Sequence, residues 1–166
     1  MTQVLTARLS PSGPVIGNPP AQIGGGAKVP GRLWVAQGAG NNANVPGAAA
    51  GDVPGLEHTT VDLQPAATGY KYDVEVDVET FGTGGGFVIN LLGSVDAGAN
   101  YTSMHTPAGT QDFSGGGRLH LTNVTNAAAT PINRIKVQLQ RNVPAAADLT
   151  YAPADCCLRV REYSGS

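Results

Sequence analysis

The stretch of sequence that decides the fold is Tyr70-Lys71-Tyr72-Asp73-Val74-Glu75-Val76-Asp77-Val78-Glu79. Apolar residues alternate along it with charged residues without a break. A period of two over a run of this length predicts a β-strand with one buried face and one exposed face. A helix would instead place Asp73 and Asp77 on the same side as Val74 and so interrupt the apolar surface. The tyrosines and valines of this strand are therefore predicted to face a core.

Similar alternation recurs on both sides of this strand. Residues 57–163 hold six predicted strands and two further candidate strands near 101–104 and 149–151. The six predicted strands lie at 59–64, 70–79, 87–92, 118–122, 134–140 and 156–161. No window carries a helical stripe, and Gly- and Pro-containing turn signals separate the runs. The pattern predicts an all-β domain over residues 56–166, an antiparallel β-sandwich or jelly roll with helix in less than about a tenth of the chain.

The same alternation predicts which side chains form the core. Each predicted core residue is the apolar member of an alternating pair, so a shift of register by one residue would reverse its direction. The set comprises Val74, Val76, Val78, Ile89, Leu119, Leu121, Ile135, Val137, Leu139, Leu158 and Val160.

The first third of the chain has a different composition. Residues 1–55 are rich in Gly, Pro, Ala and Asn, and contain only two short apolar islands, at 4–9 and 33–35. A compact domain rarely contains so long a segment with so little regular pattern. We therefore predict an extended irregular N-terminal arm over residues 1–55, ordered by contact with neighbouring molecules. A chain beginning near Gly55 would then stay folded but fail to make these contacts.

The second apolar island supplies the candidate interface residues of this arm, Leu33, Trp34 and Val35. Large aromatic side chains dominate interface energetics, and Trp34 is the one tryptophan of the chain. The alternative is that Trp34 packs on the chain's own β-sandwich.

Charge and hydropathy exclude several classes of function. Charged residues make up 13% of the 166 residues and the net charge is −2, which provides no field that would attract nucleic acid or an anionic membrane. No apolar run approaches the ~20 residues that span a bilayer. The N-terminus carries no secretory signal pattern, so we expect folding in a cytoplasm.

Catalytic, cofactor and metal-binding motifs are missing from the sequence. The two cysteines, Cys156 and Cys157, are adjacent and have no partners at metal-ligand spacing, so we expect one buried and one exposed thiol. The three histidines are scattered, and no nucleophile motif surrounds a serine. We expect no enzyme activity, no cofactor and no metal.

The acidic residues at 73, 75, 77 and 79 are predicted to form a solvated outer face or one that meets a subunit, because carboxylates on a regular strand cannot wrap a calcium ion. Two basic pairs, Arg134 with Lys136 and Arg159 with Arg161, are predicted to offset these carboxylates. They do so either across the strands of a sheet or across a subunit boundary.

The stretches at 70–79, 88–94 and 157–164 resemble those of small virion proteins of tailed phages, which are often Gly/Ala-rich, weakly charged, mostly β and end on a strand. The order of elements resembles the trimeric jelly rolls of head decoration proteins, head fibres and tail receptor-binding tips. The resemblance covers roughly residues 56–164 and is one of texture, so it transfers no individual site residue.

This resemblance implies a non-enzymatic structural protein of a virion, assembled in the host cytoplasm. Its first implication is a capsid decoration, or cement, protein that binds and stabilises a phage head. The partner would be the major capsid protein or another virion protein, and the chain would form a homo-oligomer, with a trimer favoured. Two alternatives remain open: a phage tail, fibre or receptor-binding component, and a carbohydrate-binding β-sandwich module.

Overall fold

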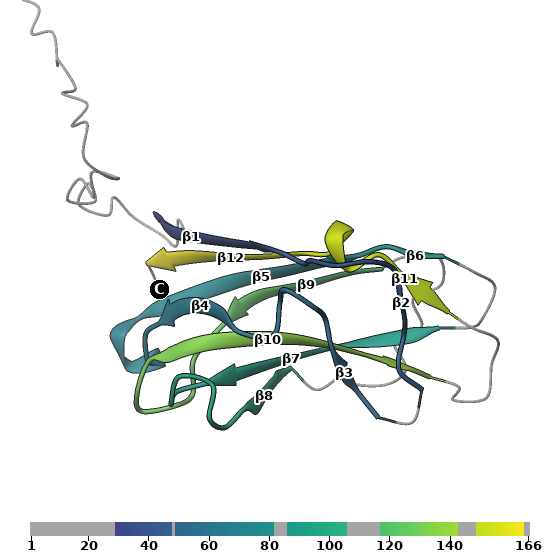
Figure 1. Cartoon of the computed structure of the whole chain (residues 1–166). Helices are drawn as coiled ribbons and strands as arrows, with labels where there is room; N and C mark the ends of the chain where they lie inside the picture. Colours follow the sequence, from purple (N-terminus) through teal and green to yellow (C-terminus); the bar gives the residue numbers. More distant parts are fainter. Residues whose placement is uncertain (1–28, 48, 82–85, 106–116, 143–148, 165–166) are drawn as a thin grey trace, which may run out of the picture.

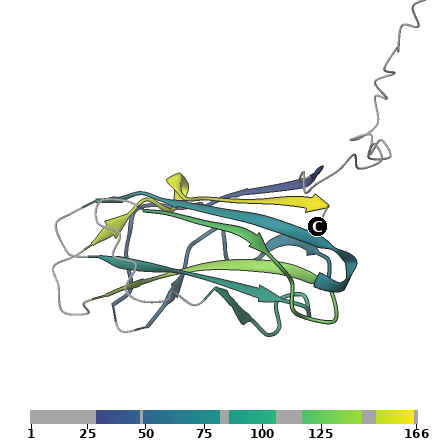
Figure 2. The same cartoon turned by 180° about the vertical axis from the view of Figure 1, so that it is seen from behind.

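The computed structural model describes residues 29–47, 49–81, 86–105, 117–142 and 149–164. Two antiparallel sheets lie face to face, and Figures 1 and 2 show these two layers from opposite sides. The strands are β1 (Val29–Gln37), β2 (Ala43–Asn44), β3 (Gly51–Asp52), β4 (Thr59–Leu63), β5 (Tyr70–Val78), β6 (Thr80–Phe81), β7 (Phe87–Ser94), β8 (Thr102–His105), β9 (Gly117–Val124), β10 (Ile132–Arg141), β11 (Thr150–Tyr151) and β12 (Cys157–Ser164). Two 3-10 turns, η1 (Ala66–Thr68) and η2 (Pro153–Asp155), interrupt them.

The long strands have jelly-roll topology. One sheet has the order β1-β12-β5-β9, and the other contains β4, β10, β7 and β8, with β3 also paired to β10. In chain order, the first of the long strands pairs with the last, the second with the seventh, the third with the sixth and the fourth with the fifth. The pairs are β1 with β12, β4 with β10, β5 with β9 and β7 with β8. This nested pairing is that of a double-sheet jelly roll, so the predicted fold class is confirmed.

A third, smaller sheet of β2, β11 and β6 closes one end of the sandwich, on the right in Figure 1. Each of its strands has two residues. The core continues to this end of the sandwich. Val45 and Leu149, which lie next to these strands, are fully or almost fully buried. The end of the sandwich is therefore covered by short strands.

The predicted register is confirmed along β5. Tyr72, Val74 and Val76 are inaccessible to solvent and Val78 nearly so, while the intervening charged residues are partly exposed. The other predicted core residues are buried too, except Leu121, which is partly buried and packs against the core. Burial of side chains of this size contributes about 1.5–3 kcal/mol each.

The prediction of an irregular arm is wrong for residues 29–55. β1 pairs with β12 along most of its length, β3 pairs with β10, and both Val45 and Val53 are fully buried. The glycines and prolines reflect turns and a break in register between Pro30 and Leu33, rather than an absence of strands. Residues 1–28 lie outside the described residues, so for them the arm stays a prediction.

Among the described residues, no helix is long and apolar enough to cross a membrane.

Candidate functional site

The most distinctive surface is the side of the β1-β12-β5-β9 sheet that faces away from the core, here called the outer face. Because side chains alternate along a strand, every second residue of each strand contributes to it. β1 contributes Leu33, Val35 and Gln37, β12 contributes Cys157, Arg159, Arg161 and Tyr163, β5 contributes Lys71, Asp73, Glu75 and Asp77, and β9 contributes Arg118 and His120.

The carboxylates of β5 lie between arginines of the two neighbouring strands. Asp77 accepts from both sides, with Oδ2 2.7 Å from Nη1 of Arg159 and Oδ1 2.5 Å from Nε of Arg118. Glu75 lies 3.2 Å from Arg118 and 3.9 Å from Arg159. The prediction that basic residues offset the acidic ladder across strands is thus confirmed for Arg159. Because solvent screens such partly exposed ion pairs, each contributes little to stability.

This arrangement changes the acidity of Asp77. Partial burial, the largest influence, acts to raise the pKa of its carboxyl group, but the hydrogen bonds from Arg118 and Arg159 outweigh it and lower the pKa below the ordinary value of 3.8. Asp77 therefore stays ionised throughout the neutral and mildly acidic range. The acidic ladder is internally neutralised at this end of the outer face.

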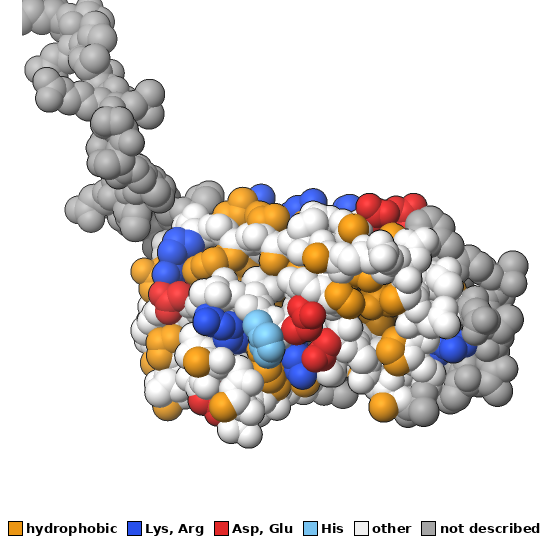
Figure 3. Space-filling view, in the orientation of Figure 1, with side chains coloured by type: hydrophobic (Ala, Val, Ile, Leu, Met, Phe, Trp, Pro, Cys, Tyr) orange, Lys and Arg blue, Asp and Glu red, His pale blue; other side chains and the backbone are white. Residues whose placement is uncertain are grey.

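The β1 edge of the outer face is apolar and exposed. Leu33 is 53% and Val35 58% accessible, which makes them the two most exposed large hydrophobic residues among those described. Beside Leu33 in the register lies Arg161, an exposed arginine for which no ion pair occurs in the described part of the chain. Figure 3 shows hydrophobic and basic side chains together along the upper edge, where Figure 1 places β1 and β12.

A depression of about 310 Å³ opens on the outer face between β1 and β9. Its lining combines apolar, acidic and basic groups from all four strands: Leu33, Asp73, Glu75, His120, Arg159, Arg161 and Tyr163. The histidine and the two carboxylates do not form a metal site, since no group of three His, Cys, Asp or Glu among the described residues could hold an ion.

The three candidate interface residues do not share one face. Leu33 and Val35 point outward, whereas Trp34 points inward and is partly buried against the core cluster. Its ring lies 6.5 Å from that of Tyr72, and the guanidinium of Arg32 lies 4.8 Å from its ring centre. For Trp34 the alternative, packing on the chain's own β-sandwich, is the observed one. For Leu33 and Val35 an interface role stays a prediction.

An ion-pair network that the sequence did not reveal fastens β1 to the body. Arg32 binds Glu162 through Nη2 at 2.7 Å and Asp62 through Nη1 at 2.5 Å, so it joins β1 to β12 and β4. The Glu162 side chain is 6% exposed, and it also accepts the backbone N–H of Arg32 at 3.3 Å. Gly31 leaves room for this carboxylate, because a Cβ there would lie 2.7 Å from its Oε1. Arg32 and Glu162 lie 130 residues apart in sequence, so no local pattern links them.

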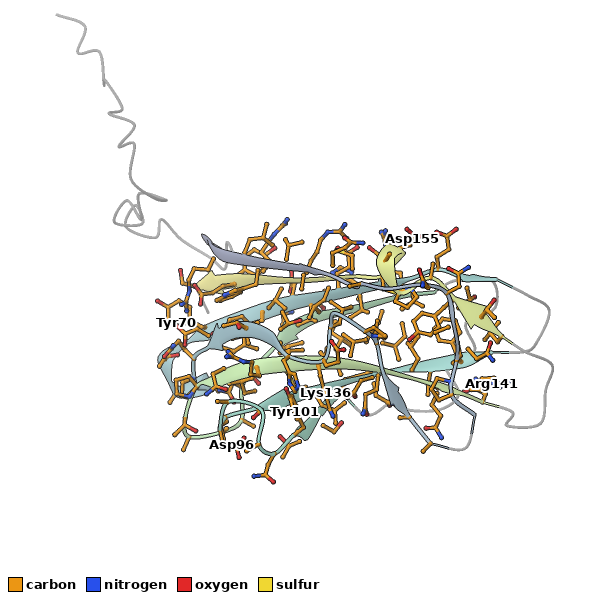
Figure 4. All side chains as sticks on the ribbon, viewed as in Figure 1. Tyr70, Asp96, Tyr101, Lys136, Arg141 and Asp155 are labelled. Carbon is orange, nitrogen blue, oxygen red and sulfur yellow. The ribbon has the colours of Figure 1, made fainter. Side chains whose placement is uncertain are left out.

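The other basic pair, Arg134 with Lys136, lies on β10 in the opposite sheet and does not face the acidic ladder. Lys136 instead lies 3.3 Å from Asp52 and 4.5 Å above the ring of Tyr101 (Figure 4). The Tyr101 hydroxyl donates to the carbonyl of Glu57, which leaves its oxygen to accept from Nδ1 of His58 at 2.8 Å. These contacts tie two loops to β10, and this cluster is structural.

Ser94 and Asp96 form a loop cap. The Ser94 hydroxyl donates to Asp96 at 2.6 Å, and Asp96 accepts the backbone N–H of Asn100 at 2.9 Å. These bonds, led by that from Ser94, lower the pKa of Asp96 to about 2. Ser94 is buried, and a carboxylate with so low a pKa is a weak base, so this pair holds the loop rather than activating a nucleophile.

The expectation of one buried and one exposed thiol is wrong, since Cys156 and Cys157 are both free and buried. Cys156 lies in the core, where burial raises the pKa of its thiol to about 11. Cys157 belongs to the outer face, but it lies in register between the longer side chains of Gln37 and Asp77. A neutral, buried thiol such as that of Cys156 is a poor nucleophile.

No protein-family model and no curated protein sequence matches this chain. Among solved structures, a chain described as "Cyanophage Pam1 capsid asymmetric unit" aligns over 92% of this chain and 99% of its own length, at 16% sequence identity and a TM-score of 0.36. A similarity of this extent carries no argument about the role of the chain, which therefore has to come from the jelly roll and its outer face.

Proposed function

We propose that this chain is a non-enzymatic structural protein of a virus particle, and that it serves as a decoration protein on a phage head. The support is architectural. The double-sheet jelly roll is a fold of viral capsid and lectin domains. The described residues contain no metal cluster, and the serine and thiols described above are either hydrogen-bonded away or buried.

One observation carries the proposal, namely the exposed apolar edge of the outer face. Leu33 and Val35 stand next to Arg161, which has no ion pair with any described residue. The core of a protein interface is apolar and enriched in arginine. The charges of Glu75, Asp77, Arg118 and Arg159 on the same face are compensated within the sheet. The outward side chains at this edge are the part of the surface that a shell protein would cover.

Deletion of the gene from its virus tests this proposal. Electron cryomicroscopy of particles with and without the protein should show density lost from the outside of the head. Loss of density from the tail or fibres would contradict a head decoration role and favour the tail alternative. Particles unchanged in every part would contradict a virion role altogether.

A pair of variants then tests the face. Purified Leu33→Glu protein should bind to deletion particles at least about tenfold more weakly than wild type, because a charge replaces an apolar contact. Thr122→Glu changes an exposed residue on β9, at the opposite edge of the sheet, and is the matched control. Equal binding of both variants would move the contact away from the β1 edge.

A carbohydrate-binding role is the second candidate, and the depression on the outer face favours it. Carboxylates, arginines and Tyr163 converge there, and sugars are bound by polar groups beside an aromatic ring. Titration of the purified protein with a panel of oligosaccharides tests it: saturable binding that Glu75→Gln abolishes would support this candidate over the decoration role.

A further inference from the structure

The free edge of β1 has a defined set of backbone groups. β1 ends the sheet, and among the described residues its only strand partner is β12. Just beyond the paired segment, the N–H of Gly38 donates to the carbonyl of Cys156. This bond continues the register in which Trp34 pairs with Val160. Since bonded and non-bonded pairs alternate in an antiparallel ladder, even-numbered positions bond to β12.

It follows that Leu33, Val35 and Gln37 direct their N–H and C=O groups toward the open edge. None of the described residues covers this stretch. Proteins protect exposed edges with prolines, bulges and charged side chains. Here Pro30 and the register shift guard only the beginning of the strand, and residues 33–37 contain neither a proline nor a charge.

We propose that the β1 edge pairs with the β1 edge of a second copy, antiparallel about a twofold axis through Val35. In this register Val35 faces its own copy, and the two exchange a pair of backbone hydrogen bonds. Leu33 and Gln37 face each other across the axis and exchange further pairs. All the backbone groups identified on the open edge are then bonded, and the pairing stops before Pro30.

The side chains agree with this register. On the inner side, the large Trp34 faces the small Ala36 of the second copy. On the outer side, two Leu33 and two Val35 side chains form one apolar stripe across a continuous eight-stranded sheet. No like charges are brought opposite each other. Arg159 and Arg161 lie one strand away on β12, and Arg32 of β1 lies outside the five paired positions and is bound to Asp62 and Glu162. Such an isologous contact is self-complementary.

The contact is small. Five paired residues on each side are far fewer than the roughly 20–30 residues a side of a standard interface. The dimer is therefore expected to be reversible and to form with rising protein concentration. This proposal does not depend on the virion role, and its twofold symmetry differs from the trimer that the resemblance implied.

Sedimentation equilibrium of the full-length purified chain tests the pairing. Wild type should follow a monomer–dimer equilibrium, and Val35→Pro should weaken it at least about tenfold by removing the central pair of hydrogen bonds. Val35→Pro should still fold, since its N–H points away from β12. Ala36→Pro is the contrast, because it removes a bond to β12 and should lower the melting temperature. A wild type that is monomeric at every concentration overturns the proposal.

Cysteine cross-linking tests the register by a second route. Across the axis, the two Cα atoms of a bonded pair lie about 5.5 Å apart, within the range for a disulfide. Val35→Cys should therefore form a covalent dimer under mild oxidation, whereas two Leu33→Cys sites would lie about 13 Å apart along the strands and should not. The native thiols are both buried and give little background. Cross-linking of Leu33→Cys as fast as Val35→Cys would overturn the proposed register.

Discussion

β5 and β1 belong to the same sheet, both border β12 and have nine residues each, yet their outward faces differ. β5 lies inside the sheet, and two of its carboxylates, Glu75 and Asp77, meet arginines from both neighbouring strands. β1 lies at the edge, and its outward Leu33 and Val35 are exposed. In this sheet the conspicuous charges are paired with side chains of neighbouring strands. The short apolar row at the edge is exposed and is available to a partner.

The inward faces of these strands differ in the same instructive way. β5 is held by a continuous row of buried apolar side chains, whereas β1 is held by Trp34 and by the Arg32–Glu162 ion pair. β1 is thus part of the sandwich, and an ion pair to β12 helps to hold it there. Truncation and substitution test whether β1 belongs to the sandwich as firmly as β5 does.

Truncation should have the largest effect. A chain beginning at Gly55 lacks β1, β2 and β3, exposes the edge of β12 and removes Arg32, the partner of Glu162. We expect it to be insoluble or unfolded by circular dichroism. A chain beginning at residue 29 keeps every described strand and is the control, and we expect it to melt close to the full-length protein. A folded Gly55 chain would restore the idea of a dispensable arm.

Val76→Asp, in the middle of β5, should also abolish soluble folding. Val76 is fully inaccessible, and an unpaired buried carboxylate costs several kcal/mol. Glu75→Ala, one residue away on the outer face, should change the free energy of unfolding by about 1 kcal/mol or less. Soluble yield and urea denaturation compare them, and equal effects would mean that the register of β5 is wrong.

Arg32→Met tests the attachment of β1. It leaves the nearly inaccessible carboxylate of Glu162 without its partner, which should lower the free energy of unfolding by about 3 kcal/mol. Arg161→Met is the matched control, since it removes an exposed arginine next to Glu162 and should change stability by about 0.5 kcal/mol or less. Urea denaturation measures both. Similar values for the two variants would show that the ion pair does not hold β1.

The sequence predicted the strands whose alternation is regular and missed those where it is interrupted. β5, β10 and β12 carry clear alternation, and their inward residues are the predicted ones. β1 was missed because a charged residue, Arg32, occupies an inward position and a glycine precedes it. Its partner Glu162 is distant in sequence, so only the fold explains that charge.

The candidate site was also only partly predictable, because local patterns are visible in the sequence and strand pairing is not. The apolar island at 33–35 was found, but a list of residues does not say that Trp34 points to the opposite face from its neighbours. That requires knowing that the segment is a strand. The compensation of the acidic ladder by Arg118 depends on strand order in the sheet, and strand order is set by tertiary pairing rather than by local pattern.

The smallest predicted effect concerns Asp77, and it tests whether the outer face of β5 is electrostatically satisfied. The pKa of Asp77 in the folded chain is lower than its ordinary value of 3.8, so its ionised form is bound more tightly when folded than when unfolded. Its contribution to stability is therefore present above about pH 4 and is lost as the pH falls through the folded-state pKa. Asp77→Asn should cost about 1 kcal/mol or less at pH 7, and the difference from wild type should shrink toward zero in acid. Glu79→Gln removes the same charge from an exposed position just beyond β5 and is the matched control for the change in net charge. Urea denaturation between pH 2 and pH 7 would decide it: a constant difference between wild type and Asp77→Asn would mean that the arginines pack against Asp77 without stabilising its charge.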